Sequence, residues 1–165
     1  MWRLICLFVI LPTLASAQGL QVGFKGLNPD SDDPIEIAAE SMSVNNETGD
    51  AVLLGDVVVI QGDMRMEAPR IDIAYTEDGG METMLATGGV LLVTSEEEVE
   101  AQTANYNVDA ETMLLTGDVL MVQGRSAISS DTMDIDLDKE VAVLSGRVRT
   151  ILYSDDDDDA ADTAN

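Results

Sequence analysis

Carboxylates are the most abundant side chains with catalytic potential in this sequence. It contains 32 Asp and Glu residues but no His. A pair of carboxylates could in principle cleave a glycosidic bond by acid–base chemistry. The most regularly spaced acids, however, are Asp134, Asp136 and Asp138, and they alternate with apolar residues. Acids in that pattern lie on the solvated face of a strand, where no desolvated pocket raises their pKa.

The usual partners of a catalytic carboxylate are missing as well. Histidine is absent, and the single cysteine, Cys6, lies in the N-terminal apolar run. This removes the usual general base, the usual nucleophile–base pairs and the usual transition-metal ligands. We therefore expect a protein that is not an enzyme and that has no cofactor and no metal site.

The net charge excludes one class of partner. The formal charge is −24 at pH 7, whereas a nucleic-acid-binding protein needs a basic footprint. Part of the charge falls in residues 154–165, which we interpret as a disordered acidic tail. The run Asp155–Asp159 lacks the glycine-bearing, spaced loop of a calcium motif.

The first residues have the pattern of a secretory signal peptide. Arg3 precedes an apolar run from Leu4 to Leu14, and Ala15-Ser16-Ala17 follows as a small-residue cleavage motif. We expect cleavage after residue 17. The next segment, residues 18–33, is rich in glycine and aspartate and is expected to be a flexible lead-in.

A short phrase recurs through the rest of the chain. It reads Gly-Asp-Val-Val-Val-Ile-Gln-Gly from Gly55 and Gly-Asp-Val-Leu-Met-Val-Gln-Gly from Gly117, with briefer versions at Gly88 and Gly146. The leading glycines are separated by 33, 29 and 29 residues. The longer spacing is explained by an insertion at 76–80. A period near 29 residues predicts stacked repeats that share one core and one functional surface.

Between the glycines, apolar and polar residues alternate with a period of two. The alternation is clearest from Met133 to Asp138. It is typical of strands with one buried and one solvated face. We predict an all-β domain over residues 34–153 with about 12 to 16 short antiparallel strands. The pattern alone leaves a barrel, a sandwich and an open jelly roll as alternatives.

The interior positions are aliphatic, with several methionines and almost no aromatic residues. Methionine adapts to irregular apolar shapes and is used at promiscuous binding surfaces. The same residues could equally fill an ordinary core. From the residues alone both interpretations stand.

Several of these phrases together resemble a known family. Pro34-Ile35-Glu36-Ile37, the Gly55 phrase, Met64-Arg65-Met66-Glu67 and Arg70-Ile71-Asp72-Ile73 resemble the LptA/OstA family over about residues 34–153. The resemblance implies an open, twisted β-jelly roll with an apolar groove. It also implies a periplasmic protein that carries lipopolysaccharide between inner-membrane and outer-membrane complexes. The implied partners are LptC-like and LptD-like jelly rolls and further copies of the chain, joined head to tail.

The resemblance also indicates which residues contact the lipid. Family contacts carry over to Ile35, Ile37, Tyr106 and Val108. The alternation extends the set to other inward positions: Val57, Val59, Met64, Met66, Ile71, Ile73, Val119, Met121, Met133 and Ile135.

The two ends of an open roll should present unpaired strand edges. We expect these edges around residues 35–44 and 141–153, with Arg147 and Arg149 on the second edge facing acids of an incoming strand. Two other interpretations remain at this stage. One is an LptC-like jelly roll of the same pathway, and the other is a structural β-repeat protein with a closed core.

Overall fold

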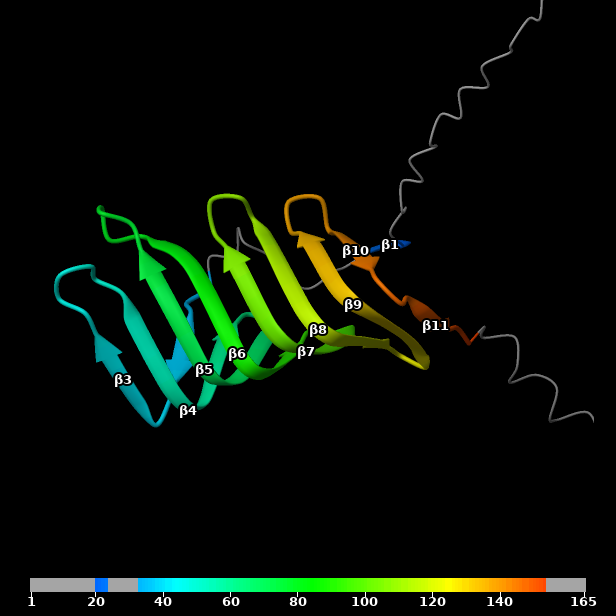
Figure 1. The fold of residues 1–165 in the computed structure, drawn as a ribbon, viewed down its shortest axis with the longest axis horizontal. Helices are drawn as coiled ribbons and strands as arrows, with labels where there is room; N and C mark the ends of the chain where they lie inside the picture. The colour runs from blue at the N-terminus through cyan, green and yellow to red at the C-terminus, as the bar shows by residue number, and fades with distance from the viewer. Residues whose placement is uncertain (1–19, 24–32, 154–165) are drawn as a thin grey trace, which may run out of the picture.

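The computed structural model describes residues 20–23 and 33–153, which form eleven strands and no helix (Figure 1). No helix in this part of the chain is long and apolar enough to cross a membrane. The predicted signal peptide and acidic tail lie outside the described residues. The strands are β1 (Leu20–Gly23), β2 (Glu36–Ala38), β3 (Ser41–Val44), β4 (Ala51–Gln61), β5 (Met64–Tyr75), β6 (Met81–Val93), β7 (Glu97–Asn107), β8 (Thr112–Gln123), β9 (Ser126–Asp136), β10 (Val141–Ser145) and β11 (Arg149–Ile151).

All eleven strands belong to one antiparallel sheet. Its order is β1-β10-β9-β8-β7-β6-β5-β4-β2, with β3 also on β4 and β11 also on β9. From β4 to β10 each strand pairs with the next in the chain, so these connections are hairpin turns. The predicted all-β class and open antiparallel sheet are therefore confirmed.

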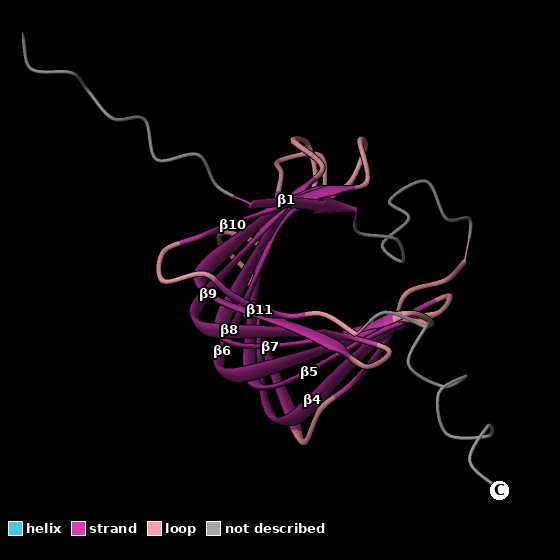
Figure 2. Ribbon diagram, turned by 90° about the vertical axis from the view of Figure 1, so that its right-hand side faces the viewer, coloured by secondary structure: helices cyan, strands magenta, loops and turns pink. Residues whose placement is uncertain are grey.

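The long strands are bent in the middle, and the bends line up across the sheet. The register shifts between Leu54 and Val57, between Thr87 and Val90, and between Thr116 and Val119. Each shift is a β-bulge that places two residues of one strand opposite one residue of its neighbour. In Figure 2 the bent strands outline a C that is open on one side.

This corner divides the sheet into two arms. Arm 1 contains residues 41–54, 70–87, 103–116 and 132–145, and arm 2 contains residues 36–38, 57–68, 90–101, 119–130 and 149–151. Each strand from β4 to β9 contributes one segment to each arm. That is why the sequence pattern suggested more and shorter strands than the structure has.

The repeat glycines form the corner. Gly55, Gly88, Gly117 and Gly146 have φ between +74° and +95°, a left-handed conformation that glycine adopts without steric cost. A side chain from an earlier segment, Glu40, Pro69, Gln102 or Asp131, also lies close over each glycine. A Cβ atom on Gly117 would lie 2.7 Å from the Cβ of Gln102. The period read in the sequence is therefore the period of the bend.

The insertion predicted at 76–80 lies in the turn between β5 and β6. There Thr76 accepts a backbone hydrogen bond from Gly79, and its own amide bonds to Gly80. The extra residues lengthen this hairpin and leave the corner in line.

Only part of the expected edges is open. β2 and β3 pair only with β4, and β11 pairs only with β9, among the described strands. The expectation that the last strand lacks a second neighbour is wrong for β10, because β1 pairs along it from Leu20–Leu144 to Gly23–Val141. Residues 20–23, placed by the sequence in a flexible lead-in, thus form a strand at the far end of the sheet (Figure 1).

We predict that Gly117→Ala destabilises the protein more than Gly124→Ala. Both glycines have positive φ, +84° and +58°, but a Cβ on Gly124 meets nothing within 4 Å. The left-handed conformation alone costs alanine about 1–2 kcal/mol, and the clash with Gln102 adds to this cost at Gly117. Urea unfolding measures both values. Equal losses would show that the contact over the corner is unimportant.

Candidate functional site

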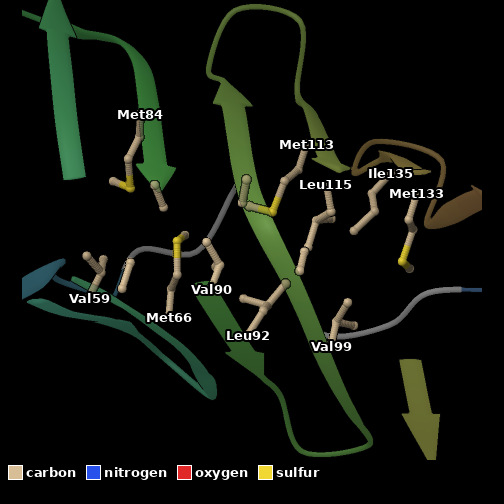
Figure 3. Packing of buried hydrophobic residues seen from close by; sticks show 14 of the residues in the cluster. Val59, Met66, Met84, Val90, Leu92, Val99, Met113, Leu115, Met133 and Ile135 are labelled. Atoms are coloured by element: carbon tan, nitrogen blue, oxygen red, sulfur yellow. The ribbon is translucent and has the colours of Figure 1, made fainter. Parts of the chain in front are cut away.

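The inner faces of the two arms form one apolar interior. Nine of the predicted lipid contacts are 2% exposed or less and belong to a single cluster. These are Val57, Val59, Met66, Ile71, Ile73, Val119, Met121, Met133 and Ile135. Figure 3 shows part of the cluster, with side chains of different strands converging on the space between the arms.

Some strands keep the same alternation of buried and exposed residues on both sides of the bulge, and others reverse it there. On β4 the buried residues Leu53 and Val57 have the same parity on both sides of the bulge. On β5 the parity changes between Ala68 and Ile71. The bulge absorbs the mismatch, so the apolar residues of both arms face inward.

The sequence analysis missed several equivalent inner positions. They are buried like the predicted ones and lie in the same rows: Leu53, Met84, Leu92, Val99, Met113, Leu115, Ile128 and Leu144. The alternation that selected the others could have found these residues too.

The remaining predicted contacts lie at the margins of the interior. Ile35 and Ile37 are 45% and 43% exposed at the β2 end, where no further strand follows. Val108 lies in the turn after β7 and is half-buried. The first strand segments therefore leave apolar side chains uncovered at one end of the interior.

A second margin follows the hairpin turns, where the arms end away from the corner. Met64, on arm 2, and Tyr75, Met81 and Tyr106, on arm 1, are partly buried against the cluster. Tyr75 and Met81 were not predicted. Burial, helped by the nearby Glu111 carboxylate, raises the pKa of the Tyr106 phenol above its usual value. The phenol is therefore neutral throughout the physiological range.

The end of arm 2 carries a buried polar cluster. Glu97 is 3% exposed and accepts hydrogen bonds from Thr94 Oγ1 at 2.9 Å and from Gln123 Nε2 at 3.0 Å. Thr94 Oγ1 also accepts the Glu97 amide at 3.1 Å. Gln123 belongs to the repeated Gln-Gly element, so this element connects the β8 end of the arm to β7.

The predicted edge arginines differ in their surroundings. Arg147 binds Asp131 of its own chain, with its Nε 2.7 Å from Oδ1, and lies 3.6 Å from Asp118. Both contacts hold the pKa of the guanidinium above its usual value, the Asp131 hydrogen bond most strongly. Arg149 lies on β11 opposite Ser129, and no ion pair to it is found among the described residues. Arg149 is thus the more available cation at this edge.

The described interior can shield apolar groups from water. Its lining is aliphatic, and no group of three or more His, Cys, Asp or Glu residues that could hold a metal occurs in residues 20–23 and 33–153. The outer face of the same strands carries the acids, for example Glu67, Glu100 and Asp134. Such an arrangement separates an apolar inner face from a charged outer face.

Comparison with known proteins agrees with this geometry. Residues 36–149 match the family described as LptA/(LptD N-terminal domain) LPS transport protein. The chain belongs to this family. The match covers both arms and every corner glycine.

Two individual relatives add to the comparison. An uncharacterised protein of Rhizobium meliloti is 27% identical over 74 residues, which are 45% of this chain and 40% of that protein. The match thus spans less than half of that relative. The crystal structure of LptH from Pseudomonas aeruginosa, described as the LptA-homologous periplasmic component of a lipopolysaccharide transport device, superposes with a TM-score of 0.68. It is 17% identical and covers 76% of this chain and 99% of LptH. At that identity the likeness concerns the fold, which is the LptA-like jelly roll.

We predict that Gln123→Ala costs about 1–2 kcal/mol of folding free energy, because it removes a hydrogen bond from the buried Glu97 carboxyl group. The control is Glu98→Ala, on the exposed face of β7, which should change stability little. Denaturant unfolding compares the two. If both substitutions have the same small effect, the polar cluster does not support the arm.

Proposed function

We propose that this protein is a periplasmic carrier that shelters the acyl chains of lipopolysaccharide between its two arms. The observation that carries the proposal is the single apolar interior, which runs across all the repeats. Among the described residues its buried polar side chains are Ser130 next to the corner and Thr94 and Glu97 at the end of arm 2. Acyl chains in water expose a large apolar area at a cost of roughly 25 cal/mol per Å². An aliphatic trough removes that cost.

The described interior is closed by its own side chains, so lipid entry must replace these contacts. Residues such as Ile71, Leu115 and Met133 have no exposed surface. Acyl chains that separate the arms would exchange one set of apolar contacts for another, and such an exchange changes the free energy little. The methionines suit this role because their side chains adapt to new shapes.

The charge pattern requires the phosphorylated headgroup to stay outside the trough. Acids crowd the outer face, and no Lys or Arg is found among the described residues buried in the interior. An anion held between the arms would therefore be desolvated without a partner, which is strongly unfavourable. The proposed carrier thus holds only the lipid tails, with the headgroup in water beyond the open side.

Both ends of the sheet support end-to-end transfer. The first segments leave Ile37, Met42 and Val44 between 43% and 60% exposed, and Ile151 and Leu152 are 59% and 75% exposed at the other end. Strand edges at β2, β3 and β11 are templates for another strand. Because the two ends differ, joined copies would form an open chain whose troughs run on from one to the next. LptC-like and LptD-like jelly rolls could terminate such a chain.

We predict that Ile37→Glu lowers affinity for lipopolysaccharide by about tenfold or more, because it puts an unpaired carboxylate beside the acyl chains. Ile37 lies opposite the inner residue Val59. It is exposed enough for the variant to fold, as circular dichroism can verify.

The matched control for Ile37→Glu is Glu36→Gln, which lies opposite Ile60 on the outer face and should bind normally. Equilibrium binding of fluorescent lipopolysaccharide measures both variants. Equal affinity of the two folded variants would exclude lipid from this trough.

Removal of β11 should prevent assembly while lipid binding remains. We expect a chain that lacks residues 146–165 to bind lipopolysaccharide but to remain monomeric, because β11 is then absent. A chain that lacks only residues 155–165 keeps the contact of Arg125 with the Tyr153 ring, 4.7 Å away, and should associate at least as well as the parent. Light scattering distinguishes them. Unchanged oligomers in the longer deletion would exclude this edge as the joint.

A further inference from the structure

β1 pairs with β10 at the position where the pattern of the repeat would place a different strand. At each junction between repeats, the residue two before the leading corner glycine pairs with an inner residue of the next strand. Leu53 pairs with Ile71, Ala86 with Ala104, and Leu115 with Met133. On β10 the equivalent residue is Leu144, and it pairs with Leu20 of β1.

The register agrees at the second inner position too. Met113, two residues before Leu115, pairs with Ile135, and Ala142, two residues before Leu144, pairs with Val22. β1 therefore continues the sheet in the register of one more repeat. It comes, however, from the N-terminal side of the chain and not from a fifth repeat.

A second copy would offer its own first strand at the same place. In the first repeat, Met42 and Val44 of β3 hold the positions that Met133 and Ile135 hold in the last. The sequences Leu20-Gln21-Val22 and Met42-Ser43-Val44 share the order apolar, polar, apolar. The chain thus carries two segments that fit one edge.

Burial shows that the two ends of arm 1 differ. Met42 and Val44 of β3 are 60% and 50% exposed, whereas Ala142 and Leu144 of β10 have no exposed surface. Within the described part of the chain, β10 has a strand on each side, and β3 has a strand on one side only. The arm-1 edge of β10 is therefore occupied, while the β3 edge is free.

β1 covers only half of this end. It stops at the arm-1 segment, and β11, the arm-2 continuation of β10, has no second strand among the described residues. From Gly23 to Glu36 an extended chain reaches about 45 Å. The eight strand spacings that separate β1 from β2 in the sheet order amount to about 38 Å. A segment of this length can tether β1 to the far end of its own sheet.

We propose that β1 is a removable cap. It pairs with the arm-1 edge of β10, the edge with which β3 of a second copy would otherwise pair. The incoming copy pairs its β2 with the open β11 and then displaces β1 with its β3. Because β1 is tethered, its effective concentration is in the millimolar range for a short linker. The cap therefore restricts assembly at low protein concentration. This inference rests on the end-to-end assembly proposed above.

The test uses the protein purified from the periplasm with two variants. One lacks residues 20–23. The other carries Gln21→Cys and Val143→Cys, because these two residues are register partners. Facing residues in an antiparallel pair are close enough for a disulfide, so oxidation should lock β1 in place. Sedimentation equilibrium measures self-association, and thermal unfolding verifies that each variant is folded.

We expect the deletion to raise the association constant about tenfold or more, and the oxidised lock to lower it by a similar factor until dithiothreitol reverses the effect. Equal association of the locked, reduced and deleted forms would overturn the proposal. So would a disulfide that joins two copies, because β1 would then act between chains. Fluorescent lipopolysaccharide binding is measured on the same samples. Its absence in every form, with the association pattern intact, would reject the lipid function and leave the cap standing.

Discussion

The left-handed backbone at the corner is the constraint on which the other features depend. A flat antiparallel sheet with one apolar face would expose that face to water. Here Gly55, Gly88, Gly117 and Gly146 bend the strands along one line, so the apolar face folds onto itself and one sheet forms its own core. Side chains such as Gln102 and Asp131 cross the glycines so closely that no Cβ fits. Stability and shape are therefore set at the same few residues, and every inner side chain depends on them for its partner in the opposite arm.

A sheet that bends instead of closing has consequences at its ends. In a barrel the first and last strands pair and no edge remains. Here β2 and β3 pair on one side only among the described strands, and the inner residues Met42 and Val44 of β3 stay exposed. The same geometry that builds the apolar interior thus leaves it open at the β2–β3 end and, on arm 2, at the β11 end. Continuation of the trough into a neighbour follows from the fold without an added binding module, since the joint repeats the pairing found between β4 and β5.

Much of this architecture could be predicted from the sequence, and what could not has a physical reason. Alternation around Met133–Asp138 predicted strands with one wet face, and the glycine period predicted a repeat, because both are local properties. Local patterns do not tell whether a glycine ends a strand or bends it, so the strands were expected to be shorter. The pairing of β1 with β10 joins segments at opposite ends of the chain, and four residues of alternating character carry too little signal to predict it. Glu97 was missed for a related reason. It has the sequence context of a surface acid, and its burial is accounted for by hydrogen bonds from Thr94 and from Gln123, 26 residues away.

Repetition also explains why assembly and self-capping are linked in this fold. Each strand of a repeat protein is held by neighbours that resemble one another, so the edge of the last repeat accepts any strand with the right alternation. Such an edge cannot distinguish by register between Leu20-Gln21-Val22 of its own chain and Met42-Ser43-Val44 of another. Which of the two strands occupies the edge then depends on the tether of β1 and on how much of the edge each copy can pair with. The tethered strand has the advantage of effective concentration, whereas the incoming copy gains pairing on both arms, since its β2 can add to β11 while β1 cannot. A carrier built from equivalent units can therefore remain separate when dilute and join when a partner is held nearby, with no dedicated regulatory domain.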